Sequence, residues 1–257
     1  MLRALIFDVD GTLADTESAH RAAFNQAFAQ FGLDWCWDEA LYTQLLEVSG
    51  GKERILHYWR TAQPPPAKAD AAAMQDTVNR LHALKTAAYE AAVDGGAVSL
   101  RPGVHRLMGE ALAGGLRLAI ATTTTPANIA ALLRRAVGAD WRRNFAAIGD
   151  ASNAPLKKPH PQVYRNVLAA LQLEPAACLA FEDSGNGLQA ASAAGLATVI
   201  TPTRYTAGHD FSDALRVLPD LGRVDVAQLR SWHRAGLHPE PAARTGEENN
   251  ASQTPAQ

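Results

Sequence analysis

Two carboxylates near the start of the chain have the spacing of a reactive pair. Asp8 and Asp10 stand directly after the apolar residues 5–7, and Gly11 and Thr12 follow them. Such an apolar run is typical of a buried parallel strand, and the C-terminal ends of these strands form the ligand crevice of open α/β sheets. Two acids at that edge can share a Mg²⁺ ion, and one of them can act as a nucleophile. The alternative is a strand that ends in a simple acidic turn.

Three further groups of polar residues follow strand-like runs later in the chain. Threonines occupy positions 122–125, where hydroxyl and backbone N–H groups can bind phosphate oxygens or merely cap a helix. Lys157 and Lys158 precede a proline-bounded helix and can hold a phosphate as point charges, or be solvated loop residues. Glu182 and Asp183 follow another strand-like apolar run. They would either lie beside Asp8 and Asp10 in one acidic cluster or cap a helix. Together these groups predict one polar site at a sheet edge.

Cationic residues between the first acidic pair and the threonines indicate that the chain binds a second anion, in addition to a phosphate at the sheet edge. Gly50 and Gly51 precede Lys52 and Arg54, so free backbone N–H groups and two cations could face an anion, and Lys85 stands in a later alanine-rich helix. Each cation taken singly could also be an ordinary surface charge. As a cluster, they suggest a pocket for a second phosphate.

The positions of the apolar residues predict an α/β fold interrupted by helices. Strands are expected at 116–121, 145–148, 178–181 and 197–201, with helices at 103–115, 126–138, 161–172 and 185–195. Between the first strand and residue 97 the pattern is helical, at 16–31, 38–46, 52–61 and 68–93. We therefore expect a discontinuous core of residues 1–14 and 97–237, a helical cap of residues 15–96 above its catalytic edge, and a disordered tail of residues 238–257.

Composition narrows the classes of partner. The chain has 257 residues, 47% of them hydrophobic, and a formal net charge of −2, so no charge excess points to nucleic acid or a membrane surface. Trp35 and Trp37 could stack on bases but are better explained by packing. Cys36 and Cys178 are too few for a disulfide framework, which favours a reducing cytoplasm. The N-terminus leaves no room for a signal peptide, and we expect a cytoplasmic monomer that binds neither nucleic acid nor a membrane.

The four groups resemble, in order, the motifs of the haloacid dehalogenase (HAD) superfamily of phosphohydrolases. The resemblance implies a Rossmann-like core with a parallel sheet and a small helical cap. It also implies phosphoryl transfer through an aspartyl phosphate. Asp8 would be the nucleophile and Asp10 the acid and base. Thr122, Thr123 as a backbone donor, and Lys158 would neutralise the phosphoryl oxygens, with Lys157 as the fallback lysine.

The same resemblance implies Mg²⁺ as the cofactor. Its ligands would be Asp8, the main-chain oxygen of Asp10, and Asp183. Glu182 would be either a ligand or a residue that supports one. All these residues are present in the chain, which disfavours a catalytically dead binding protein.

The insert resembles the cap of the β-phosphoglucomutase-like subgroup and, more closely, that of CbbY-type phosphatases. This closer resemblance rests on Glu17, on residues 50–54 and on residues 35–38. It implies a sugar bisphosphate such as xylulose 1,5-bisphosphate as substrate, and a place beside the carbon-fixing Calvin cycle. By position, the substrate contacts would be Glu17, Tyr42, Gly50, Gly51, Lys52, Arg54 and Lys85.

A phosphomutase is the alternative activity. His20 shares a helix face with Glu17 and matches a histidine of the mutase, so we also count it among the substrate-binding residues. Both activities use the same phosphoenzyme, and they differ in whether water or a sugar hydroxyl attacks it. The sequence leaves that choice open.

Overall fold

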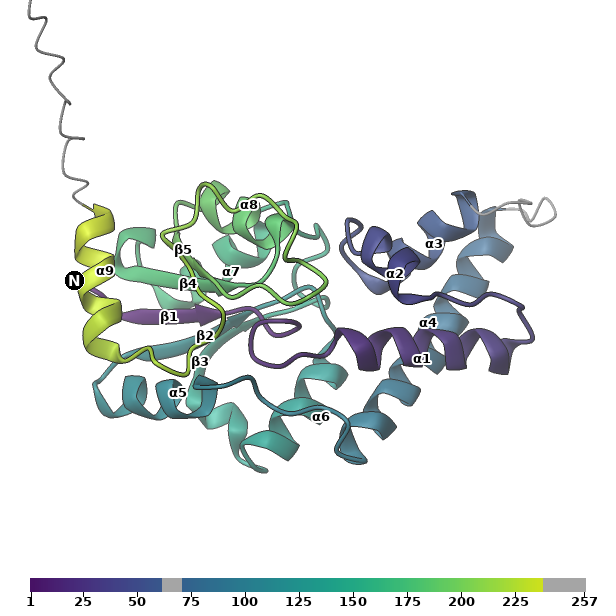
Figure 1. Cartoon of the computed structure of the whole chain (residues 1–257), viewed down its shortest axis with the longest axis horizontal. Helices are drawn as coiled ribbons and strands as arrows, with labels where there is room; N and C mark the ends of the chain where they lie inside the picture. The colour runs from purple at the N-terminus through teal and green to yellow at the C-terminus, as the bar shows by residue number, and fades with distance from the viewer. Residues whose placement is uncertain (62–70, 238–257) are drawn as a thin grey trace, which may run out of the picture.

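The computed structural model describes residues 1–61 and 71–237 of the chain (Figure 1). The tail predicted to be disordered and the first residues of the helix predicted from residue 68 lie outside these residues. Within the described ranges, no helix has both the length and the apolar character needed to cross a membrane.

The described residues form one six-stranded parallel sheet in the order β3-β2-β1-β4-β5-β6. This is the order of a Rossmann-like, doubly wound fold, as expected. The strands are β1 (Ala4–Phe7), β2 (Arg117–Ala121), β3 (Phe145–Gly149), β4 (Cys178–Glu182), β5 (Ala197–Ile200) and β6 (Arg216–Val217). The sequence pattern predicted the first five strands but not the two-residue β6.

Helices cover both faces of the sheet, because successive side chains of each strand point to opposite sides. Leu5 and Phe7 pack into a cluster with α5 and α6, whereas Ala4 and Ile6 face α7 and α8 (Figure 1). The helices of this part are α5 (Val104–Ala113), α6 (Pro126–Ala136), α7 (Gln162–Leu171), α8 (Gly185–Ala193) and α9 (Val226–Leu237), with short 3₁₀ turns η1 (Trp141–Asn144) and η2 (Pro175–Ala177). The helix α9 was not predicted.

In the described part of the chain, four helices between β1 and α5 lie beside the end of the sheet (Figure 1), and the C-terminal part of the last one packs against the core cluster. They are α1 (Glu17–Phe31), α2 (Glu39–Leu45), α3 (Gly51–Thr61) and α4 (Ala71–Asp94). We call them the insert. Its interior is a cluster of aromatic and aliphatic side chains that includes Phe24, Phe28, Trp37 and Tyr42. Trp37 is fully buried there, which supports its interpretation as a packing residue.

The two chain segments that lead into and out of the insert lie side by side. Ala14 forms an isolated antiparallel bridge with Leu100, and the backbone N–H of Arg101 donates to Leu13 O over 2.8 Å. The insert therefore leaves and rejoins the rest of the molecule, which we call the core, at one place.

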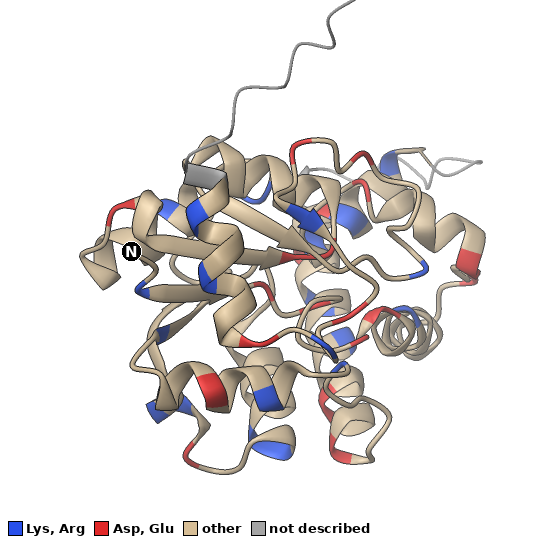
Figure 2. Ribbon diagram, turned by 60° about the vertical axis from the view of Figure 1, so that its left-hand side comes forward, with Lys and Arg blue, Asp and Glu red and all other residues tan. Residues whose placement is uncertain are grey.

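Acidic and basic residues are interspersed over the ribbon, in keeping with the small net charge (Figure 2). Neither cysteine is in a disulfide: Cys36 is exposed and Cys178 is buried.

Candidate active site

Three acidic side chains meet at the C-terminal ends of β1 and β4. Phe7 and Phe181 are paired in register, so Asp8 and Glu182 leave neighbouring strands side by side, and Asp183 follows. One oxygen of each carboxylate lies within 4.8 Å of the others, and all three residues are buried. The crevice is at the point where the strand order reverses, which is the usual ligand site of such sheets.

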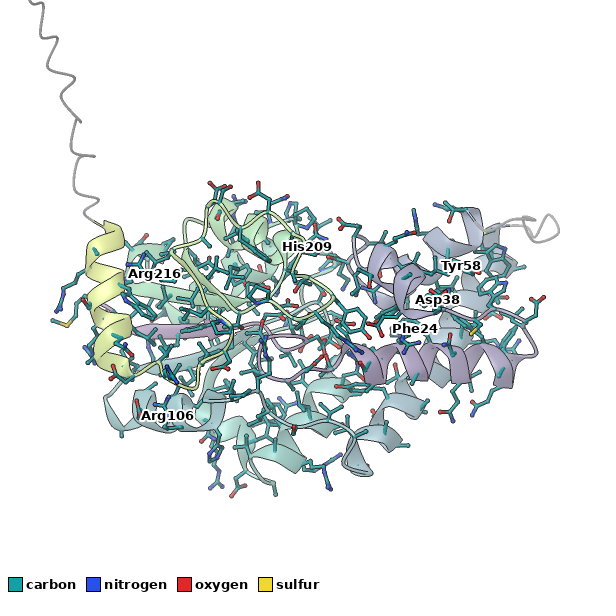
Figure 3. The ribbon with its side chains drawn as sticks, viewed as in Figure 1. Phe24, Asp38, Tyr58, Arg106, His209 and Arg216 are labelled. Atoms are coloured by element: carbon teal, nitrogen blue, oxygen red, sulfur yellow. The ribbon has the colours of Figure 1, made fainter. Side chains whose placement is uncertain are left out.

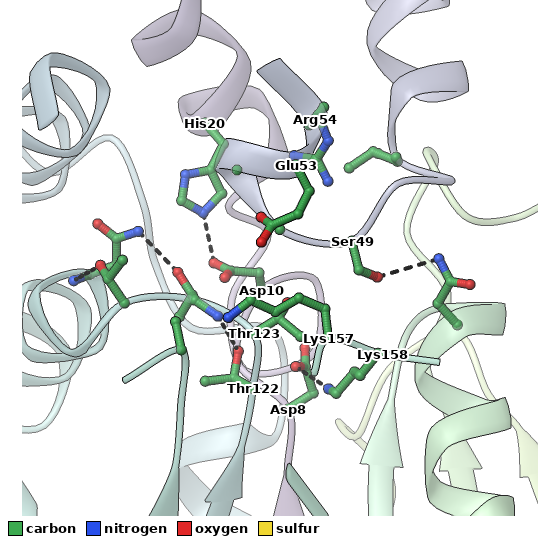
Figure 4. Close-up of a pocket in the computed structure, with 18 of the residues that line it drawn as sticks. Asp8, Asp10, His20, Ser49, Glu53, Arg54, Thr122, Thr123, Lys157 and Lys158 are labelled. Carbon is green, nitrogen blue, oxygen red and sulfur yellow. Dashed lines mark hydrogen bonds and ion pairs between the residues drawn. The ribbon is translucent and has the colours of Figure 1, made fainter. Parts of the chain in front are cut away.

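Lys158 is the cation that joins two of these acids, and Figure 4 shows its contact with Asp8. Its Nζ lies 2.6 Å from Asp8 Oδ1 and 2.5 Å from Glu182 Oε1, and it donates to Ala121 O over 2.9 Å. Burial opposes the charged lysine, but the two carboxylates outweigh it and hold the pKa of Lys158 above its usual value. Of the two candidate lysines, the structure therefore pairs Lys158 with the acids.

The acidic cluster has more negative charge than one lysine balances. Burial, opposed by Lys158 and reinforced by Glu182 and Asp10, raises the pKa of Asp8 to about 7. Burial and the neighbouring Asp8 and Glu182 likewise raise the pKa of Asp183. Glu182 Oε2 has no hydrogen-bond partner among the described residues, although Oε1 accepts from Lys158 and from the Tyr164 hydroxyl. These are the electrostatics of a site that favours a bound cation.

Two glycines allow the backbone to approach the cluster closely. A Cβ added at Gly11 would lie 2.1 Å from Asp183 Oδ2, and one added at Gly187 would lie 1.9 Å from Glu182 Oε2. Gly11 also has a φ of +82°, which side chains rarely adopt. The glycine after the first acidic pair is therefore required by the geometry of the site.

Asp10 belongs to a second, separate network. Its Oδ1 accepts from Thr16 Oγ1 and from His20 Nε2, each at 2.8 Å, and His20 Nδ1 lies 2.8 Å from Lys85 Nζ. Because a lysine ammonium only donates, Nδ1 is the acceptor and Nε2 carries the proton donated to Asp10. Burial alone would raise the pKa of Asp10, but attraction to His20 and the bonds from His20 and Thr16 hold it below its usual range. Burial also lowers the pKa of Lys85, to about 8.

The threonines after β2 divide into two roles. Thr122 is buried, and its hydroxyl accepts from the N–H of Thr124 at 3.3 Å. Thr125 caps α6 by accepting from Asn128 N. Thr122 and Thr123 both line the cavity, so the capping interpretation holds for Thr125 but does not account for the first two.

The predicted site residues other than Tyr42, which is buried inside the insert, line one cavity of about 550 Å³ between the sheet edge and the insert (Figure 4). They are Asp8, Asp10, Glu17, His20, Gly50, Gly51, Lys52, Arg54, Lys85, Thr122, Thr123, Lys158, Glu182 and Asp183. The volume is in the range of small-molecule sites.

The insert wall contains bonds that the sequence pattern did not indicate. Arg54 is buried, and its guanidinium donates to Leu45 O at 3.0 Å and to Val48 O at 3.1 Å, where α2 ends and leaves carbonyls without helical partners. The Tyr42 hydroxyl donates to Glu17 Oε2 over 2.7 Å. Lys52 Nζ donates to Asn79 Oδ1 over 2.8 Å. Lys52 and Arg54 thus already have partners within the insert.

Several cavity residues were missed. They include Ser49, Glu53, His82 and Asn186. His82 lies three residues before Lys85 on α4, and that spacing could have signalled it. Burial, together with the charge of Lys85, lowers its pKa to about 3.

A family model for haloacid dehalogenase-like hydrolases matches residues 2–195. The protein CbbY encoded on a plasmid of Cupriavidus necator is 54% identical over 252 residues, which cover 92% of this chain and 98% of that protein. CbbY of Rhodobacter capsulatus is 49% identical over 86% of this chain and 94% of that protein.

Solved structures agree with the sequence comparison. CbbY from Rhodobacter sphaeroides, in complex with phosphate, superposes with a TM-score of 0.83 at 41% identity and covers 90% of this chain and 100% of that one. A β-phosphoglucomutase from Clostridium difficile has a TM-score of 0.74 at 19% identity, over 92% of this chain and 99% of that one, and shares the fold. The chain belongs to the haloacid dehalogenase-like hydrolases and, within them, to the CbbY proteins. It is a phosphatase.

Proposed function

We propose that this enzyme hydrolyses a small sugar bisphosphate, such as xylulose 1,5-bisphosphate, through a phosphoryl group carried on Asp8. The observation that supports this most directly is the buried Asp8–Lys158 contact beneath a cavity whose opposite wall contains Lys52, Arg54 and Lys85. A mutant of the Rhodobacter sphaeroides CbbY, 40% identical over 89% of this chain and 99% of that one, has been solved with xylulose-(1,5)bisphosphate, at a TM-score of 0.83.

In this proposal Asp8 attacks phosphorus, and the cavity supplies the charge that the reaction needs. Lys158, the Thr122 hydroxyl and the Thr123 backbone are the groups on the core side that can neutralise the equatorial oxygens. Stabilising charge around the transferring group is most of what phosphoryl transfer requires. Lys158 already holds Asp8 in one orientation, so the nucleophile needs little rearrangement.

In this proposal Asp10 first donates a proton to the leaving oxygen and then accepts a proton from the attacking water. The bonds from Thr16 and His20 keep it ionised while the cavity holds no anion. A phosphate dianion placed beside it favours the protonated form, because a like charge raises the pKa of a carboxylate. Asp10 would therefore act as an acid only after the substrate binds. Lys85 would influence the protonation of Asp10 through its contact with His20.

The residues present fit a Mg²⁺ ion. Its ligands would be hard oxygen atoms from Asp8, Asp183 and the main chain of Asp10, with Glu182 as a further ligand or as support. The negative charges of these buried carboxylates lie close together, which favours a divalent cation. When bound, Mg²⁺ would add charge neutralisation at the phosphoryl oxygens.

The second phosphate would lie against the insert. Gly50 precedes α3 and Gly51 is its first residue, and Lys52, Arg54 and Lys85 bring positive charge to the same wall. This arrangement favours a bisphosphate over a monophosphate. Cytoplasmic location, a monomeric state and a role beside the Calvin cycle stay predictions.

A phosphate-release screen over mono- and bisphosphorylated pentoses and hexoses tests the proposal. We expect the enzyme to release phosphate from a pentulose bisphosphate. This release should stop when EDTA removes divalent metal and resume when Mg²⁺ is added. Isomerisation of a sugar phosphate without net phosphate release would overturn hydrolysis in favour of the phosphomutase.

A further inference from the structure

One segment of the core reaches into the insert. Tyr205 lies between β5 and β6, yet its side chain is only 3% exposed and belongs to the hydrophobic cluster of the insert. Its ring meets that of Tyr42 edge-on, with centroids 5.9 Å apart, and its hydroxyl lies 3.2 Å from Ser18 Oγ on α1. Tyr205 is thus a core residue whose packing partners are in the insert.

The turn that presents Tyr205 is fixed to the core. Arg101 donates to Thr201 O over 2.5 Å and to Pro202 O over 3.0 Å. The backbone N–H of Thr203 donates to Thr206 Oγ1 over 2.9 Å, and that of Tyr205 to Thr203 Oγ1 over 3.2 Å. Because the base of the turn has these bonds, a displacement of the insert would have to break the contacts of Tyr205 rather than carry the turn along.

Polar contacts between core and insert surround this aromatic contact. Arg204 lies 3.4 Å from Glu39, and both side chains are more than half exposed, so this pair contributes little by itself. Two further contacts join the core to Glu47, which lies between α2 and α3. His209 Nε2 lies 3.4 Å from Glu47 Oε1, and Asn186 Nδ2 donates to Glu47 O over 3.0 Å. Figure 3 shows His209 on the core side facing the insert, which contains Phe24, Asp38 and Tyr58.

We propose that Tyr205 is a positioning residue, which holds the insert over the catalytic edge and thereby, through Tyr42, places Glu17 at the cavity. The contacts lead directly from Tyr205 to Tyr42 and, through the Tyr42 hydroxyl, to Glu17. The consequence for the sugar bisphosphate rests on the proposed function, whereas the consequence for the position of the insert does not.

The position of the insert can be measured without turnover. In a Cys36→Ser background, spin labels at Asp76→Cys on α4 and Arg143→Cys on the core report the distance between the two parts. Both sites are exposed, and Cys178 is buried. We expect a narrow distance distribution that broadens in Tyr205→Ala and is retained in Tyr205→Phe. Tyr58→Ala is the matched control, because Tyr58 packs on Trp35 and Trp37 inside the insert. A folded Tyr205→Ala protein with the parent distribution would overturn the proposal.

Kinetics give the second measurement. Tyr205→Ala should raise KM for xylulose 1,5-bisphosphate about tenfold, while kcat/KM for acetyl phosphate, which is too small to reach the insert wall, stays within about twofold. Equal losses for both substrates, or an equal KM rise in Tyr58→Ala, would mean general loosening of the insert and overturn the assignment. If even the parent enzyme released no phosphate from sugar bisphosphates, the proposed function would fail while the distance measurement still decided the role of Tyr205.

Discussion

The two walls of the cavity are built differently. On the core side, parallel strands in fixed register bring Asp8, Glu182 and Asp183 together, and buried Lys158 joins two of them directly. On the insert side, Glu17 and Arg54 are placed by packed helices and are bonded mainly to other parts of the insert. The nucleophile and the acidic cluster are therefore fixed by the sheet, whereas Asp10 is held in part by His20 of α1, and the groups proposed for recognition depend on how the insert helices pack and where they are held.

The largest effect should come from the nucleophile. Asp8→Asn should lower phosphate release by about 10⁴-fold or more, because the amide removes the attacking oxygen charge. Calorimetry should show that the variant still binds the sugar bisphosphate, since the insert wall is intact. Turnover near that of the parent enzyme would remove Asp8 from the mechanism.

The buried ion pair should dominate stability on the core side. Lys158→Met leaves two buried carboxylates without their cation and should lower the free energy of unfolding by about 3–5 kcal/mol. Lys157→Met is the matched control, because Lys157 is only partly buried, and its effect should stay within about 0.5 kcal/mol. Urea unfolding without Mg²⁺ compares them. Equal effects at the two positions would contradict the assignment of Lys158.

A smaller effect should appear as pH dependence where the two walls meet. Lys85, with a pKa of about 8, is charged below that pH and loses its charge above it. We therefore expect kcat/KM to fall as the pH rises through 8, because the donor to His20 is lost. Lys85→Met should have lower activity at neutral pH, by about tenfold, and should lack this alkaline fall. If kcat/KM of the variant still fell as the pH rises through 8, the titrating group would be another residue.

The insert wall should give the smallest effect. Tyr42→Phe removes the hydrogen bond to Glu17 and keeps the ring packing, so KM should rise about fivefold with kcat nearly unchanged, as expected for one lost hydrogen bond. Steady-state kinetics with the bisphosphate measure this. A fall in kcat comparable to that of a core variant would show that the two walls are not as separate as their contacts indicate.

The core side could be predicted from sequence because its signals are local. Asp8, Thr122 and Asp183 follow apolar strands directly, and Lys158 lies in the proline-containing loop before α7. Parallel register then brings the strand ends together, as for Asp8 and Asp183. The insert could be predicted only as helices. Nothing near Arg54 in sequence reveals that its guanidinium binds the carbonyls at the end of α2, and nothing near Tyr205 reveals that its ring packs more than 150 residues away, against Tyr42. Likewise β6 has two residues, too few for a period to be recognised.

The single attachment of the insert has a consequence for how this enzyme can be rebuilt. Because Ala14 and Leu100 are bridged at the core surface, the two ends of the insert are already adjacent. A different helical unit could be grafted between them without altering any strand of the sheet. If the proposed function holds, substrate preference would change with the insert, and the core residues that contact it, among them Arg204, Tyr205 and His209, would have to be redesigned together with a new one.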